Sequence, residues 1–144
     1  MNVILEKIKD FYRQSNPDTG RIFHGRGHMY PGFEGVVIDA YPPVVLITLF
    51  EELKDSELEE LVAALQRQEA VTCLVLQRRY LPQAPGEIVF GTLPEDHVVT
   101  ENGCKFSINL NRAQNSGLFL DMANGRQWLL KNSQDKRVLN LFSY

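Results

Sequence analysis

The fold is decided by two neighbouring runs of sequence, Val36-Val37-Ile38-Asp39-Ala40-Tyr41 and Val44-Val45-Leu46-Ile47-Thr48-Leu49-Phe50, which only Pro42-Pro43 separates. Runs rich in β-branched and apolar residues favour strands, and so short a connection predicts a hairpin, although Pro-Pro is a poor primed turn. The second run is apolar almost throughout, which is typical of a strand that is covered on both faces.

Helices are expected on both sides of this hairpin. Residues 3–13 carry apolar side chains at helical spacing, and a series of turn formers from Ser15 to Gly20 follows them. After the hairpin, Ser56 and Glu59 form a capping-box pattern in front of an apolar stripe that runs from Leu58 to Leu65. A helix that begins at this capping box, with an acidic first turn, is therefore predicted.

The second half of the chain predicts short strands. They are expected at residues 71–76, 87–90, 98–100 and 105–110. A tight turn is expected at Glu101-Asn102-Gly103, because Asn-Gly readily takes positive φ. Asp121 is expected to cap a helix that extends to about Lys131, with Trp128 and Leu129 inward. Residues 137–142 resemble a buried parallel strand, which needs neighbours that this sequence does not supply.

Composition limits the function classes. The 144 residues carry a formal net charge of −3, so nucleic-acid binding would need a local basic patch. The longest apolar stretch is strand-sized and the first residues lack a secretory pattern, so neither a membrane span nor a signal peptide is expected. Cys73 and Cys104 lie in strand-like surroundings, which favours reduced thiols and a cytoplasmic location.

The glycine-rich stretch from Arg21 to Gly35 is predicted to be a loop. Its basic side chains, with aromatic residues beside them, suit contacts with RNA phosphates and bases. The candidate RNA-binding residues are Arg21, His24, Arg26 and His28, extended by Arg78, Arg79 and Arg112 if these fold nearby. An ordinary structured loop is the alternative. No metal site is expected, since no Cys or carboxylate cluster accompanies the two histidines.

A family resemblance rests on several motifs in order. They are Tyr30-Pro31-Gly32-Phe33 with Val37-Ile38-Asp39-Ala40-Tyr41, then Glu101-Asn102-Gly103-Cys104-Lys105-Phe106, then Gln114 to Asp121 with Arg126, and finally Arg137-Val138-Leu139-Asn140-Leu141-Phe142-Ser143-Tyr144. In this order and spacing the chain resembles class I S-adenosylmethionine-dependent methyltransferases of bacterial ribosomal RNA, the branch that includes large-subunit cytosine-5 methyltransferases.

The resemblance implies a fold and a division of the chain. The expected fold is α+β: a mixed or antiparallel sheet with flanking helices, followed by the first strand of a truncated Rossmann-like domain. Residues 1–20 would be an N-terminal helix and turn, residues 21–110 a substrate-recognition domain, and residues 111–144 the start of the methyltransferase domain. Catalytic residues would lie beyond Tyr144.

The resemblance also implies a cofactor and a function. S-adenosylmethionine would be the cofactor of the parent protein and would not bind well to these residues alone. The residues that match its flanking motif are Gln114, Ser116, Gly117, Phe119, Asp121 and Arg126. The chain would then be the RNA-recognition part of an RNA methyltransferase, inactive by itself. The alternative is a non-catalytic module that binds RNA or self-associates, for instance as a homodimer through the exposed edge of residues 137–142.

Overall fold

The computed structural model describes residues 1–13, 18–84, 86–110, 116–139 and 141. Its helices are α1 (Asn2–Tyr12), α2 (Asp55–Gln66) and α3 (Ala123–Asn132), with a short 3₁₀ turn η1 (Leu120–Met122) before α3. Its strands are β1 (Gly20–His24), β2 (Val36–Tyr41), β3 (Val44–Leu49), β4 (Cys73–Arg78), β5 (Gly86–Gly91), β6 (Val98–Glu101) and β7 (Cys104–Ser107). The predicted mixed α+β fold is confirmed.

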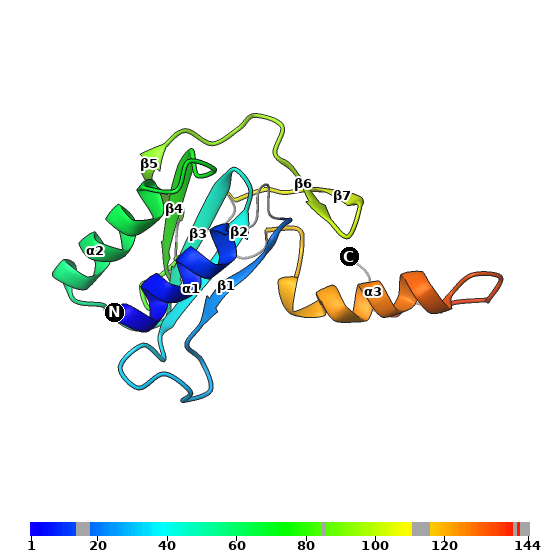
Figure 1. The fold of residues 1–144 in the computed structure, drawn as a ribbon, viewed down its shortest axis with the longest axis horizontal. Coiled ribbons are helices and arrows are strands. Elements are labelled where there is room, and N and C mark those ends of the chain that lie inside the picture. The colour runs from blue at the N-terminus through cyan, green and yellow to red at the C-terminus, as the bar shows by residue number, and fades with distance from the viewer. Residues whose placement is uncertain (14–17, 85, 111–115, 140, 142–144) are drawn as a thin grey trace.

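Strands β1 to β5 form one sheet in chain order. The β3–β4 pair is parallel and the other three pairs are antiparallel, so α2 serves as the crossover between β3 and β4. Strands β6 and β7 form a separate two-stranded hairpin, turned by Asn102 at φ 50° and Gly103 at φ 78°, as the Asn-Gly pair predicts. Figure 1 shows α1 and α2 together on one face of the large sheet.

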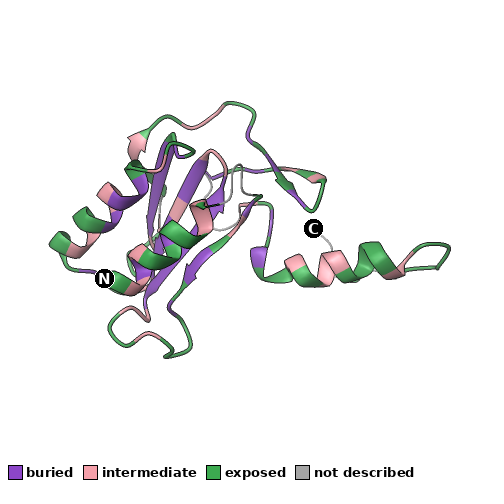
Figure 2. Ribbon diagram, in the orientation of Figure 1, coloured by how far each residue is buried: buried purple, intermediate pink, exposed green. Residues whose placement is uncertain are grey.

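The face of the sheet beneath α1 and α2 is the main core. Alternate side chains of β2 and β3, such as Ile38 and Ile47, pack there against Ile4 and Ile8 of α1 and Leu61 of α2. Because successive residues of a strand point to opposite faces, the residues between them face away from the helices. Figure 2 shows that the strands of the large sheet are mostly buried, whereas α1 and α2 carry many exposed residues.

Part of the opposite face carries a second apolar cluster. Tyr41, Val44 and Cys73 of the sheet pack there against Leu118 and Leu120 from the segment that precedes α3. Burying this apolar surface holds the late segment over the sheet. The segment covers only part of that face, and the remainder carries polar side chains such as Asp39, Thr48 and Gln77.

Three elements differ from their predictions. Residues 21–35 were expected to be a loop, but Gly20–His24 forms β1, since Ile22 and Phe23 are buried and the edge of β2 offers backbone partners. Helix α2 follows Lys54 and no side chain caps it, so the Ser56 capping box is wrong. The acidic first turn is present as Asp55 and Glu57. Strand β4 lies two residues later than the predicted 71–76.

The prediction for the end of the chain is wrong in two respects. Helix α3 follows Met122 rather than an Asp121 cap, and it buries no residue: Trp128 is 62% exposed. Residues 137–139 form no strand, and Leu139 is 81% exposed. Residues 140 and 142 of the predicted strand lie outside the described residues, and residues 137–139 do not form the strand edge that would support a homodimer.

The two cysteines are free thiols, with Cys73 buried and Cys104 only partly so. Within the described parts of the chain, no helix is both long and apolar enough to cross a membrane.

Candidate functional site

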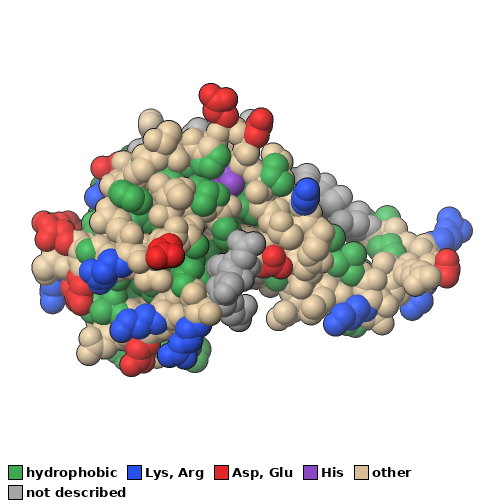
Figure 3. Space-filling model, turned by 45° about the horizontal axis from the view of Figure 1, so that its top comes forward, with side chains coloured by type: hydrophobic (Ala, Val, Ile, Leu, Met, Phe, Trp, Pro, Cys, Tyr) green, Lys and Arg blue, Asp and Glu red, His purple; other side chains and the backbone are tan. Residues whose placement is uncertain are grey.

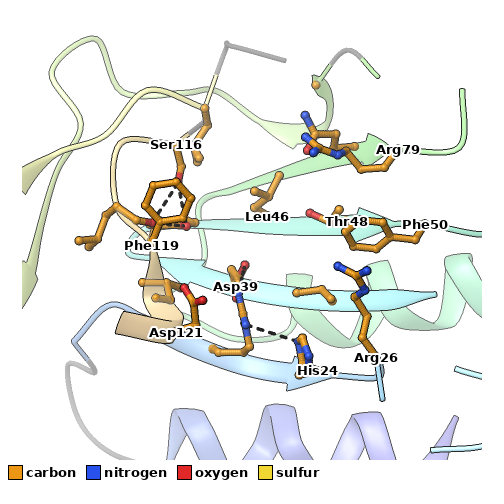
Figure 4. A pocket seen from close by; sticks show the side chains of 18 of the residues that line it. His24, Arg26, Asp39, Leu46, Thr48, Phe50, Arg79, Ser116, Phe119 and Asp121 are labelled. Carbon is orange, nitrogen blue, oxygen red and sulfur yellow. Dashed lines mark hydrogen bonds and ion pairs between the residues drawn. The ribbon is translucent and has the colours of Figure 1, made fainter. Parts of the chain in front are cut away.

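A pocket of about 330 Å³ lies over the polar part of the sheet face that α1 and α2 do not cover. Side chains that alternate with the core residues line its floor, among them Val37 and Asp39 of β2 and Leu46 and Thr48 of β3. The segment 116–121 forms one wall, and residues that follow β1 and β4 form another. Figure 4 shows these side chains converging on one space.

An ion pair crosses the pocket floor from β1 to β2. Arg21 and Asp39 are register partners, and Arg21 Nε donates to Asp39 Oδ1 at 2.8 Å. Burial raises the pKa of Asp39, and the Arg21 guanidinium counteracts part of that rise. A charge pair at this depth needs good geometry to offset desolvation, and the strand register provides it.

His24 continues this polar chain. Its Nδ1 lies 3.4 Å from Arg21 Nη1. Because a guanidinium can only donate, Nδ1 acts as the acceptor, so a neutral His24 carries its proton on Nε2. Desolvation lowers the pKa of His24, and the nearby charges of Arg21 and Arg26 lower it further. The imidazole is therefore held as a neutral N–H donor in an electropositive surrounding.

Two further arginines lie at one end of the pocket. The guanidinium carbon of Arg26 lies 4.4 Å from the centroid of the Phe50 ring, a cation–π contact. Arg79 follows β4, and its backbone N–H donates to Leu49 O at 2.7 Å. Figure 4 shows Arg26 and Arg79 on opposite sides of Thr48 and Phe50.

The other end of the pocket is fixed by Tyr41. Its hydroxyl lies 2.9 Å from Ser116 Oγ and 3.2 Å from the carbonyl oxygen of Leu118. Burial raises the pKa of Tyr41 to about 12, so the hydroxyl stays protonated and can donate. These bonds hold the wall on which Phe119, 54% exposed, and Asp121 face the cavity.

The pocket thus unites two sets of predicted residues. Ser116, Phe119 and Asp121 come from the set implied for the cofactor, and Arg21, His24, Arg26 and Arg79 come from the set implied for RNA. Gln114 and Arg112 lie outside the described residues.

Other predicted site residues do not line this pocket. His28 is exposed in the loop after β1, and Arg78 pairs with Glu87 of β5. Gly117 has φ 94°, and a Cβ there would lie 3.1 Å from Ser107 O, so it forms a turn that favours glycine.

Arg126 of α3 makes a bidentate ion pair with Glu101 of β6, at 2.6 and 2.8 Å, and donates to Phe119 O at 2.8 Å. It thereby ties α3 to the β6–β7 hairpin and to the wall of the first pocket. Arg126 itself lines a second, largely apolar pocket of about 240 Å³ between that hairpin and α3.

Sequence reasoning missed Asp39, Thr48, Phe50 and Gln77, which all line the first pocket. A signal was present for two of them: Asp39 and Thr48 are polar residues inside otherwise apolar strands, on the face that alternates with the core. In the described part of the chain, no group of three or more His, Cys, Asp or Glu side chains is placed to hold a metal ion.

Known proteins are similar to this chain in sequence and in fold. Residues 20–144 match the family described as S-adenosylmethionine-dependent methyltransferase. The "Ribosomal RNA large subunit methyltransferase" of Deinococcus radiodurans is 32% identical over 137 residues, which cover 88% of this chain and 33% of that protein. The "Ribosomal RNA large subunit methyltransferase I" of Pseudoalteromonas atlantica is 28% identical over 120 residues, which cover 78% of this chain and 30% of that protein.

A solved structure has the same fold. A Streptococcus mutans protein, assigned as an S-adenosylmethionine-dependent methyltransferase, superposes with a TM-score of 0.71 at 23% identity. The superposition covers 92% of this chain and 36% of that protein. The chain belongs to the family of S-adenosylmethionine-dependent methyltransferases. It spans about a third of the length of the relatives named above.

Proposed function

We propose that this chain is the RNA-recognition part of a protein that transfers a methyl group from S-adenosylmethionine to ribosomal RNA, and that the chain alone is inactive. Its membership in the methyltransferase family and the ribosomal RNA methyltransferases among its relatives support this proposal. Residues 21–110 would contact the RNA, and residues 111–144 would lead into the cofactor domain. Work on ribosomal RNA implies a cytoplasmic location.

One observation carries the proposal: a single pocket is lined by residues from both predicted sets. A methyl transfer requires the acceptor atom to lie within a few ångströms of the donor methyl group, so the two binding sites must meet. A cavity with Arg26 and Arg79 at one end and Phe119 and Asp121 at the other has that arrangement (Figure 4).

The residues of the segment 116–121 fit the cationic end of the cofactor. When bound, S-adenosylmethionine supplies an electrophilic methyl group on a sulfonium, and it also carries an ammonium group. The exposed ring of Phe119 and the carboxylate of Asp121 would attract such positive charges. Gly117 would shape the turn between Ser116 and Phe119, and Arg126 would hold that turn through the Phe119 carbonyl.

Labelled methyl transfer tests the function. A protein that carries this chain together with a cofactor domain of the size found in its relatives should methylate ribosomal RNA, and the 144-residue chain alone should not. Phe119→Ala in that larger protein should raise the KM for S-adenosylmethionine about tenfold or more, because the ring contact with the sulfonium is lost. If no RNA substrate incorporates label, the proposed methyl transfer to RNA by the whole protein is refuted.

A second candidate is an RNA-binding module without catalysis. It is favoured by the basic side chains, Arg26 among them, that line one end of the pocket. This candidate predicts salt-dependent RNA binding by the chain and no methyl transfer in the larger protein.

A further inference from the structure

The arginines around the sheet pocket differ in how their charges are compensated. Arg21 is paired with the buried Asp39 on the pocket floor, and Arg78 is paired with Glu87 on β5. Arg26 has no carboxylate at ion-pair distance among the residues that the structure describes. The charge that Arg26 brings to the pocket is therefore available to an anionic ligand, whereas the charges of Arg21 and Arg78 are largely neutralised inside the protein.

Phe50 gives this available charge a defined position. The guanidinium of Arg26 lies over the Phe50 ring at 4.4 Å. A guanidinium stacked on an aromatic face has its N–H donors in its own plane, so their outer edges remain free to bind oxygen atoms. Arg79 and the Thr48 hydroxyl line the same end of the pocket, and Figure 4 shows Arg26 and Arg79 flanking Thr48 and Phe50.

We propose that this end of the pocket is a phosphate subsite, in which Arg26 and Arg79 bind the oxygens of a phosphodiester group in single-stranded RNA. The Thr48 hydroxyl donates to the same group, and Phe50 is the positioning residue that seats Arg26. The choice of RNA as ligand rests on the function proposed above. Planar, forked guanidinium groups match the paired oxygens of a phosphate, and a cavity of about 330 Å³ is sized for a small-molecule or single-nucleotide unit rather than for a duplex.

The electrostatics of the pocket agree with this orientation. Burial is the largest cause of the lowered pKa of His24, and the charges of Arg21 and Arg26 are the next largest. The electrostatic potential near His24 is therefore positive. The carboxylate of Asp121 lies at the other end, beside Phe119 (Figure 4). A phosphate should therefore settle near Arg26 and away from Asp121. Its negative charge should raise the pKa of His24, which gives a spectroscopic signature of binding.

The first experiment measures binding of a labelled single-stranded oligoribonucleotide to the full 144-residue chain by fluorescence anisotropy, at several salt concentrations. Arg26→Ala should weaken binding about five- to tenfold and reduce the salt slope by about 0.7, because one phosphate contact is lost. Arg26→Lys should restore much of the affinity, and Phe50→Leu should weaken binding less than Arg26→Ala does. The matched control is Arg13→Ala, an exposed arginine that pairs with Asp10 at the end of α1 and should change affinity less than about twofold.

The second experiment follows the His24 imidazole by NMR during titration with inorganic phosphate and, separately, with the oligoribonucleotide. Each should raise the pKa of His24 in the wild-type chain and not in Arg26→Ala.

Separate outcomes decide between the two proposals. If the oligonucleotide binds the wild type and Arg26→Ala behaves like Arg13→Ala, the phosphate subsite is refuted while RNA binding stands. If inorganic phosphate raises the pKa of His24 but no RNA binds at low salt, the subsite stands and RNA recognition by this chain is refuted. If neither ligand has an effect, both proposals are refuted.

Discussion

At the scale of single residues, the chemistry of each arginine depends on its nearest carboxylate. Arg21 and Arg126 meet the buried carboxylates of Asp39 and Glu101, and each pair joins two elements of the fold. A buried carboxylate without such a partner would be costly, so these two arginines serve the structure first. Arg26 meets an aromatic ring instead, and its charge remains available at the pocket.

Arg126→Ala should destabilise the chain. The Glu101 side chain is only 5% exposed, and the substitution leaves its charge buried without its partner. The expected loss is about 2–3 kcal/mol in the free energy of unfolding, measured by urea denaturation. The double variant Arg126→Ala with Glu101→Gln should recover part of this loss. A single variant within about 0.5 kcal/mol of wild type would show that the ion pair contributes little.

Asp39 should make the stability of the chain depend on pH. Burial raises its folded-state pKa above the ordinary 3.8, so the folded protein holds this proton more tightly than the unfolded chain does. The resulting stabilisation is present below 3.8 and is lost as the pH rises through the folded-state pKa. Asp39→Asn cannot titrate, so its stability relative to wild type should increase as the pH rises through that range. Urea unfolding at a series of pH values measures the difference, and a constant difference would contradict this account of Asp39.

At the scale of elements, local pattern predicted α1, the β2–β3 hairpin and the Asn-Gly turn, because each is specified by neighbouring residues. Prediction from local pattern failed where contacts with residues distant in sequence determine the secondary structure. Gly20–His24 contains two basic residues and resembles a loop, yet it becomes a strand because β2 presents an edge. Helix α3 has apolar residues that were expected to face inward, but no described element covers Trp128.

Gly25, the residue that follows β1, allows a test of how closely the backbone packs at the end of this strand. A Cβ on Gly25 would lie 1.8 Å from the carbonyl oxygen of Phe33, so the backbone must move to accommodate alanine. Gly25→Ala should therefore cost about 2–3 kcal/mol in thermal or urea unfolding. Gly27→Ala is the matched control: nothing lies near its Cβ, and only its φ of 95° opposes alanine, at about 1 kcal/mol. Equal losses in the two variants would argue against close packing at Gly25.

At the scale of the whole molecule, the pocket could be predicted only in part. Family resemblance pointed to Ser116, Phe119 and Asp121, and charge pointed to Arg21, His24, Arg26 and Arg79. These residues share one cavity because of the sheet order and because Leu118 and Leu120 pack on the sheet. Neither feature can be read from a local sequence pattern. Figure 3 shows that positive and negative side chains are interspersed over the outer surface in this view, so net charge alone would not have located the site.

The central claim is that the pocket over the sheet is the surface that receives RNA. The most direct measurement is an NMR chemical-shift map of the 144-residue chain during titration with a single-stranded oligoribonucleotide. The account predicts that the perturbed signals cluster at residues lining the pocket, with the largest shifts near Arg26, Thr48 and Phe50, while α1 and α2 are unaffected. Shifts confined to the helical face or to α3, with the pocket unperturbed, would contradict it.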